Sequence, residues 1–371
     1  CLLSRGLGDV YKRQDEKNRL SVFASAANTD RDSYYGPGND PLKAYGKTTD
    51  LTAMGGAQYV HTFDKCFFMP SDLTAGLEYN RDRLKDNMWG YNRHTDQTVN
   101  IYSAFLQNEW KNDRWGILIG GRLDKHNMVD NVIFSPRANL RFNPTQNINL
   151  RLSYSSGFRA PQAFDEDMHI ENVGGTVAMI ERAKDLKEEK SQSFSVSADM
   201  YHRFGAFQTN LLIEGFYTRL TDVFVLGKPY DRGDGILVKT RSNGPGAKVM
   251  GLTLEGKVAY LSILQIQAGL TLQRSRYDEP HKWHDDAPAE KKIFRTPDTY
   301  GYFTATCTPI KPLSIALSGT YTGRMLVQRM DITAENAELG KMPERKAEAI
   351  RTPRFFDLGV KLAYDFKLYK T

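Results

Sequence analysis

The chain has 371 residues and a formal net charge of +6, from 50 Lys and Arg against 44 Asp and Glu. The basic residues are scattered rather than gathered into a stripe, which argues against nucleic acid as a partner. No run of about 18 apolar residues occurs, so a membrane protein built of helices is excluded. The missing apolar run does not exclude a membrane β-barrel, because apolar residues alternate with polar ones in the strands of such a barrel.

The first 14 residues differ in character from the rest. The stretch CLLSRGLGDVYKRQ shows none of the periodicity of the following chain and resembles translated sequencing-adapter sequence. It contains neither an initiator methionine nor a signal peptide. We therefore expect residues 1–14 to be foreign to the protein and residues 15–371 to form a partial β-barrel domain.

From Asp15 onward, segments of strictly alternating polarity recur. In residues 148–155, INLRLSYS, apolar side chains occupy every second position and Asn, Arg and Ser occupy the others. Such a segment forms a strand with one apolar and one polar face. The same pattern recurs at residues 194–200, 264–273, 313–318 and 356–362.

Two kinds of connection alternate between these segments. The short ones are residues 63–71, 111–114, 142–147, 203–206, 260–263 and 308–312. The long ones are residues 35–48, 83–98, 125–132, 158–188, 222–234, 277–296 and 327–351. This pattern predicts about 14 antiparallel strands with short turns at one end and long loops at the other, as in outer-membrane barrels.

A soluble β-sandwich would also alternate, but three features argue against it. The polar faces carry bulky side chains such as Arg151 and Glu255. Many segments exceed the roughly 10 residues that a tilted membrane-spanning strand needs. Tyrosines such as Tyr154 and Tyr260 end the apolar faces, where an aromatic girdle lies. We therefore predict an all-β fold, an antiparallel up-and-down transmembrane β-barrel of which this chain is a part.

Several motifs resemble the TonB-dependent outer-membrane receptors. The most specific is the hairpin from Ser135-Pro136-Arg137 to LRLSYSSGFRAP, which ends at Pro161. Residues 243–256 (NGPGAKVMGLTLEG) and 351–366 (RTPRFFDLGVKLAYDF) are weaker matches. The resemblance covers residues 15–371 and implies a barrel of about 22 strands whose lumen is closed by a plug domain. The plug and the first strands would lie upstream of this chain.

The resemblance also implies a function, a location and partners. An integral protein of the bacterial outer membrane would take up a scarce ligand such as a siderophore, haem or cobalamin. Its partners would be outer-membrane lipid, its own plug domain, a TonB-type energy-coupling protein and the small-molecule ligand. A passive porin-like channel is the alternative, and a plug domain upstream would distinguish the two.

The sequence predicts neither an enzyme nor a cofactor. No catalytic constellation and no metal-ligand spacing occurs, and Cys66 and Cys307 each stand alone. A Ca²⁺ site among the acidic residues after Gly157 is not expected, because a twelve-residue loop with its glycine is missing.

Four charged residues on the polar strand faces are predicted to line the lumen and contact the plug. They are Arg151, Glu255, Lys257 and Lys361. On the lipid face at mid-depth, a charge would cost about 2–4 kcal/mol. The placement of these residues is therefore a check on the strand register.

Candidates for ligand contact lie in the long connections. Arg159 and the acidic cluster with Asp165, Asp167 and His169 are expected to shape the mouth of the lumen. The alternative is that these residues form a solvated loop in which Arg159 takes part in a structural ion pair.

Two other connections combine aromatic residues with polar ones. One holds His281, Trp283 and His284, and the other holds Trp89 and Tyr91. Stacking and hydrogen bonding from such groups suit a flat or ring-shaped ligand. The alternative at both places is an ordinary polar loop with one packed Trp.

Overall fold

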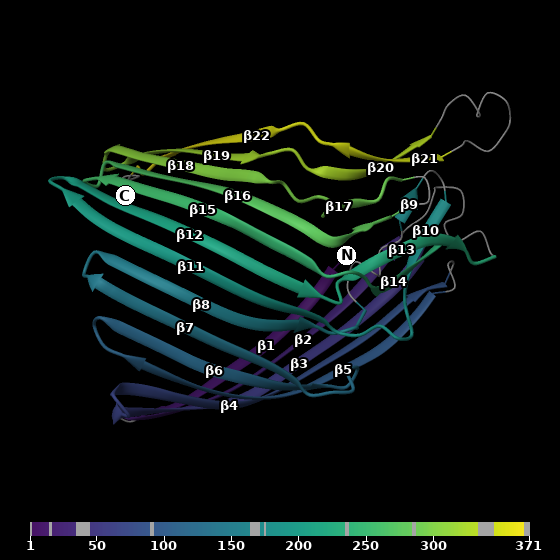
Figure 1. Ribbon diagram of the computed structural model, residues 1–371, viewed down its shortest axis with the longest axis horizontal. Coiled ribbons are helices and arrows are strands. Elements are labelled where there is room, and N and C mark those ends of the chain that lie inside the picture. The colour runs from purple at the N-terminus through teal and green to yellow at the C-terminus, as the bar shows by residue number, and fades with distance from the viewer. Residues whose placement is uncertain are drawn as a thin grey trace, which may run out of the picture.

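The computed structural model describes residues 2–14, 17–34, 45–89, 93–163, 171–173, 176–233, 237–283, 287–332 and 345–366. Antiparallel strands account for most of them (Figure 1). In this part of the chain, no helix is long and apolar enough to cross a membrane.

Fifteen of the described strands follow one another in a single antiparallel sheet. In order, they are β1 (Leu2–Gln14), β2 (Asn18–Tyr34), β3 (Tyr45–Cys66), β4 (Met69–Met88), β5 (Arg93–Lys111), β6 (Trp115–His126), β7 (Ile133–Thr145), β8 (Ile148–Arg159), β11 (Glu189–Phe204), β12 (Phe207–Thr221), β15 (Ala247–Tyr260), β16 (Leu264–His281), β18 (Thr299–Ile310), β19 (Leu313–Thr322) and β22 (Phe355–Tyr364). A short strand, β17 (Glu290–Lys292), pairs with β16. The predicted antiparallel up-and-down order is confirmed.

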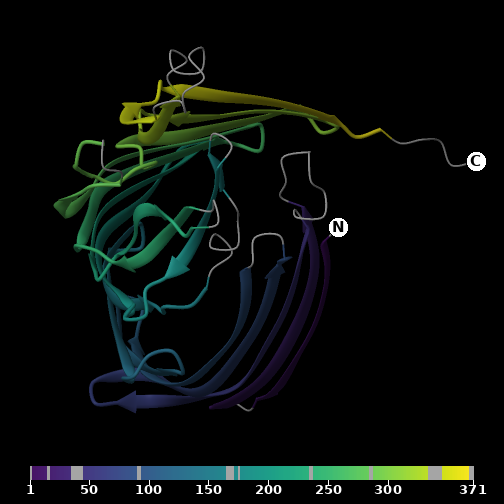
Figure 2. The same cartoon turned by 90° about the vertical axis from the view of Figure 1, so that its right-hand side faces the viewer.

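The main sheet is strongly curved, and its two edges, β1 and β22, lie apart (Figure 2). Among the described strands, β1 pairs only with β2 and β22 only with β19. Fourteen of the fifteen strands follow residue 14, which agrees with the predicted number. Residues 2–14 pair with β2 along their whole length, and the foreign origin of residues 1–14 stays a prediction.

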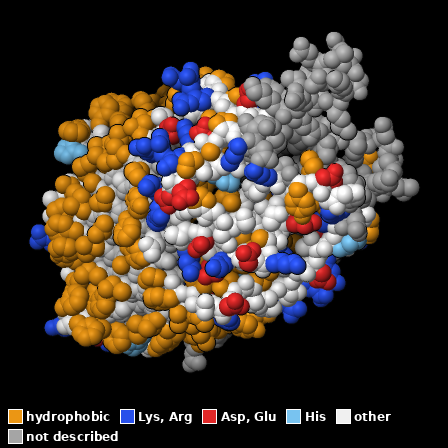
Figure 3. All heavy atoms as spheres, turned by 45° about the vertical axis from the view of Figure 1, so that its right-hand side comes forward, with side chains coloured by type: hydrophobic (Ala, Val, Ile, Leu, Met, Phe, Trp, Pro, Cys, Tyr) orange, Lys and Arg blue, Asp and Glu red, His pale blue; other side chains and the backbone are white. Residues whose placement is uncertain are grey.

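From β2 onward, one face of most strands of the main sheet carries large exposed hydrophobic side chains, as a lipid-facing surface does. Leu152 is 52% exposed and Val196, which lies beside it on the next strand, is 59% exposed. Toward the side where the long connections lie, charged side chains replace the hydrophobic ones (Figure 3). The alternation read from the sequence therefore separates a lipid-facing surface from an inward one.

The three strands β3, β4 and β5 extend beyond the apolar band. The sequence predicted a loop from residue 83 to 98, but the ladder between β4 and β5 continues to the pair Met88 and Arg93. Arg81 and Arg83 are exposed on the outward face of β4, where lipid would exclude them. This part of the sheet therefore stands above the membrane, and hydrogen bonds such as that from Thr48 Oγ1 to Asp86 Oδ1 (2.6 Å) hold its inward face together.

Other connections predicted as loops also contain strands. They are β9 (Glu171–Val173), β10 (Thr176–Arg182), β13 (Phe224–Asp231), β20 (Leu326–Ile332) and β21 (Arg345–Arg351). A further short strand, β14 (Leu237–Asn243), follows the predicted loop of residues 222–234. These segments are too short to span a membrane, and some of their described apolar side chains are buried. Val238, for example, is fully buried.

Candidate functional site

Two long connections join into one small sheet at the mouth of the barrel. The connection after β8 supplies β9 and β10, and the connection after β12 supplies β13 and β14. β10 and β14 pair in parallel, from Ala178 beside Leu237 to Arg182 beside Arg241. We call this sheet, β13-β14-β10-β9, the cap, and it lies inside the curve of the main sheet (Figure 2).

Gln97 on β5 fastens the cap connection to the barrel wall. Its Oε1 accepts hydrogen bonds from the backbone N–H of Ala163 and from Arg182 Nη1, both at 2.8 Å. The same Arg182 nitrogen donates to the carbonyl of Pro161 at 2.9 Å. Gln97 is only 7% exposed, so these bonds satisfy a buried amide.

A second set of bonds holds the other side of the cap. The Asn243 side chain accepts from the Lys187 N–H at 2.8 Å and donates to the carbonyls of Lys187 and Asp222. Glu189 at the start of β11 accepts from the Phe224 N–H at 2.8 Å. The cap is therefore joined to the start of β11 and to the end of β12.

His126 lies fully buried below the cap, at the outer end of β6. Its Nδ1 accepts from the Met128 N–H at 3.0 Å, so Nε2 carries the proton and donates to Gln162 Oε1 at 3.2 Å. Burial lowers the pKa of His126, and the ring is neutral in this arrangement. His126 therefore supports the connection as a hydrogen-bonding residue and not as a charge.

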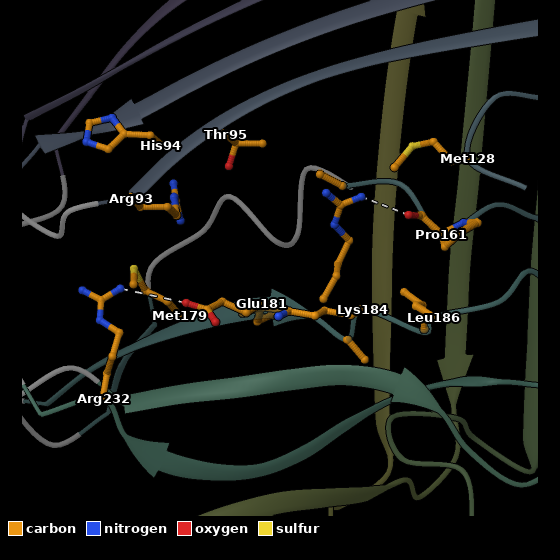
Figure 4. A pocket seen from close by; sticks show the side chains of 14 residues that line it. Arg93, His94, Thr95, Met128, Pro161, Met179, Glu181, Lys184, Leu186 and Arg232 are labelled. Atoms are coloured by element: carbon orange, nitrogen blue, oxygen red, sulfur yellow. Dashed lines mark hydrogen bonds and ion pairs between the residues drawn. The ribbon is translucent and has the colours of Figure 1, made fainter.

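A cavity of about 640 Å³ lies between β5 and the cap. Figure 4 shows Arg93, His94 and Thr95 on one side of it, and Glu181, Lys184 and Arg232 on the other. The remaining lining residues are Met128, Pro161, Ala163, Met179, Ile180, Arg182, Ala183 and Leu186. The volume falls in the range of small-molecule sites.

The cavity has a positive balance of charge. Four basic residues (Arg93, Arg182, Lys184, Arg232) and one acidic residue (Glu181) line it. Asp86, which is buried, pairs with Arg93 at 2.7 Å, and Glu181 lies 4.0 Å from Arg232. Among the residues that the structure describes, these four positive charges and two negative ones leave +2, which favours an anionic ligand.

The inward face of the wall above the membrane also holds an acidic pair, Asp50 on β3 and Asp82 on β4. Burial and the neighbouring Asp50 carboxylate raise the pKa of Asp82 to about 6. Asp82 is therefore mostly protonated below this pH. No group of three or more His, Cys, Asp or Glu side chains in the described residues is arranged to hold a metal ion.

Arg159 lies beside the cap and not in the cavity. Its guanidinium stands 5.5 Å from the ring centroid of Phe224 on β13, and its cross-strand neighbour is Glu189. A cation–π contact of this kind fixes the cap to β8. Asp165, Asp167 and His169 lie outside the described residues, so their predicted role stays a prediction.

The two aromatic clusters differ in exposure. Trp89 is 57% exposed at the top of β4, as a ligand contact would be, and Tyr91 lies outside the described residues. Trp283 is half-buried and packs edge-on against Phe294, with ring centroids 6.4 Å apart, as the alternative of a polar loop with one packed Trp expects. The contact of Trp283 with a ligand stays a prediction.

The structure describes only one of the two histidines beside Trp283. His281 ends β16, and burial lowers its pKa, although a hydrogen bond to the Leu226 carbonyl of β13 acts in the opposite direction. The contact of His281 with a ligand stays a prediction. His284 lies outside the described residues.

The predicted lumen residues follow the polar strand faces. Glu255 accepts hydrogen bonds from Tyr302 Oη at 2.6 Å and Lys257 Nζ at 3.0 Å, which ties β15 to β18. Arg151 donates to Asn149 Oδ1 at 2.8 Å on the same face of β8, and Lys361 is exposed on β22. Their contact with a plug stays a prediction.

Sequence reasoning missed the residues that build the cavity. Gln97 and Arg93 fell in a segment predicted as loop, and Arg182, Lys184 and Arg232 belong to different connections. Only the basic character of these connections was visible in the sequence. The parallel pairing that brings them together leaves no periodic signal.

The curved antiparallel sheet, with its lipid-facing side, its short turns and its strand-built mouth, defines an outer-membrane β-barrel receptor. Residues 4–370 match the family described as TonB dependent receptor-like, beta-barrel, and the chain belongs to this family. The family comprises outer-membrane receptors and transporters and not enzymes. No curated protein matches the sequence.

Solved structures share the fold at low sequence identity. The siderophore receptor PirA from Acinetobacter baumannii is 14% identical with a TM-score of 0.70, and the match covers 99% of this chain and 56% of PirA. A variant of the ferric enterobactin receptor PfeA from Pseudomonas aeruginosa is 15% identical with a TM-score of 0.71, and the match covers 99% of this chain and 54% of PfeA. The FrpB iron transporter from Neisseria meningitidis is 13% identical with a TM-score of 0.66, and the match covers 98% of this chain and 56% of FrpB. This chain thus spans a little over half the length of these structures.

Proposed function

We propose that the full-length protein is an integral outer-membrane receptor that binds an anionic iron–siderophore complex in the cavity under the cap. Import would draw on a TonB-type energy-coupling protein and pass through a lumen closed by a plug domain. The observation that carries the proposal is the positive balance of the cavity, where four basic side chains face two acidic ones. Fold relatives that include siderophore receptors support the same ligand class.

The chemistry of the lining suits such a complex. Ferric complexes of catecholate siderophores carry negative charge on oxygen atoms, and guanidinium and ammonium groups form charge-assisted hydrogen bonds to oxygen anions. Lys184 and Arg232 supply these groups from the cap side of the cavity. Arg93 and Arg182 are held by Asp86 and Gln97, so their charges stay in fixed positions.

The inward charges Arg151, Glu255, Lys257 and Lys361 would face the plug in the complete receptor. A hydrated interface between plug and wall lets such charges stay solvated, whereas the lipid face would not. The Glu255–Lys257 pair on this face is consistent with that arrangement.

The test measures how the affinity of the full-length receptor depends on the charge of the ligand and on the charge of the cavity. We expect it to bind ferric enterobactin and to bind an uncharged ferric hydroxamate far more weakly. The double substitution Lys184→Gln and Arg232→Gln should weaken ferric enterobactin binding at least about tenfold, since each hydrogen bond to a charged group contributes about 1.5–3 kcal/mol. Quenching of tryptophan fluorescence measures the affinity, and radioactive iron measures uptake.

The matched control is Arg81→Gln with Arg83→Gln, which removes the same charge from the outward face of β4. This variant should bind as the unchanged receptor does. Equal binding of the neutral and anionic complexes, or unchanged affinity after the cavity substitutions, would refute the proposal.

A further inference from the structure

A second basic cluster lies on the outward surface of the barrel, away from the cavity. Arg219 on β12, Lys248 on β15 and Arg276 on β16 form one row across three neighbouring strands. Arg274 lies two residues along β16 from Arg276 and points to the same side. These positions share the strand face of Leu272, which is exposed as a lipid-facing residue.

The cluster stands at the outer boundary of the apolar band. Met250 is beside Arg274 in the ladder and lies ten residues from Tyr260, the last residue of β15 before the short turn. Ten residues of a strand tilted by about 45° rise roughly 23 Å, close to the height of about 25 Å of the apolar band in such barrels. The basic side chains are therefore level with the headgroups of the outer leaflet.

The cluster keeps most of its charge. Among the described residues, Asp278 is the one acid that pairs with it, 2.6 Å from Arg219 and 3.7 Å from Lys248. Within the described part of the chain, no carboxylate pairs with Arg274 or Arg276, and both side chains are exposed. Four positive charges against one negative charge leave +3 on this patch.

A mostly apolar groove of about 720 Å³ begins directly below the cluster. Its lining includes Val196, Tyr217, Leu252 and Leu272 on the lipid face, and Arg274 at its upper end. Gly215 helps to form the hollow, because it has no side chain beside Val196. The groove therefore runs along the lipid face and ends at exposed guanidinium groups.

We propose that this groove and the basic cluster form a binding site for a phosphorylated lipid of the outer leaflet. An acyl chain would occupy the groove, and the phosphate of the headgroup would lie between Arg274 and Arg276. Guanidinium groups match phosphate oxygens in bidentate geometry, and a bilayer lipid presents its phosphate at this height. The inference depends on the membrane location of the receptor but not on its siderophore.

The test uses the full-length receptor in detergent and diphosphoryl lipid A as the probe, with native mass spectrometry to count bound lipid. We expect one lipid to bind with preference over a dephosphorylated lipid A that has the same acyl chains. Arg274→Gln with Arg276→Gln should weaken binding about 30-fold, on the basis of about fivefold for each basic residue near a lipid surface. Gly215→Leu should also weaken binding, since the added side chain fills the groove while its Cβ makes only an ordinary contact of 3.6 Å with Val196.

The control variant Arg81→Gln with Arg83→Gln removes two outward arginines above the membrane on β4 and should bind the lipid as before. An equal loss of lipid binding in this control would show that basic residues anywhere on the rim attract the lipid, and it would refute the proposed site. Equal binding of the dephosphorylated lipid would overturn it too, as would equal competition by the phosphorylated headgroup without acyl chains. Ferric enterobactin binding, measured on the same variants, should be unchanged, which separates this inference from the proposed function.

Discussion

At the scale of single residues, the mouth of the barrel depends on buried polar groups whose partners lie far away in the sequence. Gln97 joins β5 to residues 66 and 85 positions further along the chain. The polarity pattern shows only that Gln97 is polar. Its partners could not be predicted, because they follow from the path of two connections and not from a local repeat. Arg151 and Glu255 are different, because strand alternation alone decides on which face they lie.

The acidic pair of Asp50 and Asp82 makes the stability of the raised wall dependent on pH. The folded state raises the pKa of Asp82 to about 6, so folding favours the protonated form. The associated stability is present at low pH and is lost as pH rises through about 6. Asp82→Asn should therefore stabilise this part of β3 and β4 at pH 7.5 by about 1–2 kcal/mol, after allowance for solvent screening.

Amide hydrogen exchange, corrected for the intrinsic rate at each pH, measures this effect. At pH 4.5 the gain should largely disappear, because Asp82 is then protonated in the folded state. Asp86→Asn serves as the contrast, since it removes the partner of the buried Arg93 and should lower protection. A gain from Asp82→Asn of the same size at both pH values would contradict this account.

At the scale of elements, the short turns and the alternating strands were readable from the sequence, and the cap was not. All six predicted short turns join consecutive strands of the main sheet. The cap strands carry apolar residues in short runs, which periodicity alone cannot distinguish from packed loop segments. Their parallel pairing joins two connections that leave different strands, and no local signal encodes this.

The cap should open as one unit, because β14 lies between β13 and β10. Lys239→Pro introduces a residue without an N–H into this central strand, where Lys239 pairs with Pro229 on one side and Ile180 on the other. We expect hydrogen exchange to increase in β10 as well as in β13 and β14, with no change in β6. Lys228→Pro is the control, since Lys228 lies at the irregularity between Leu226 and Pro229, and it should leave β10 protected. Increased exchange confined to β13 and β14 in the Lys239 variant would mean that the two connections open separately.

At the scale of the whole molecule, the open sheet has two free edges. Strands β1 and β22 each have one partner among the described strands, and in lipid an unpaired backbone N–H or C=O costs several kcal/mol. The amino-acid pattern predicted the number and direction of the strands, since both follow from alternation and turn length. The curvature of the sheet and the position of its edges depend on how all the strands pack together.

The chain of residues 1–371 should therefore fail to insert alone into lipid vesicles as a stable monomer. We expect it to aggregate or to remain open to added protease, whereas the full-length receptor should insert and resist both protease and unfolding in unheated SDS. Gel mobility with and without heating measures the difference. Spontaneous insertion of the short chain as a protease-resistant monomer would show that its edges pair with each other.

The raised part of β3, β4 and β5 gives the receptor an uneven profile at the cell surface. From Arg81 to Met88 the ladder continues for eight residues, roughly 25 Å of strand, before the chain turns back. The cavity lies beside the tip of this wall, because Arg93 and His94, which line it, pair with Met88 and Asn87 at the end of the ladder. A body as large as an antibody domain or a phage tail tip would therefore meet the outward side chains of the wall at the height of the cavity, before it could touch the lower parts of the barrel rim.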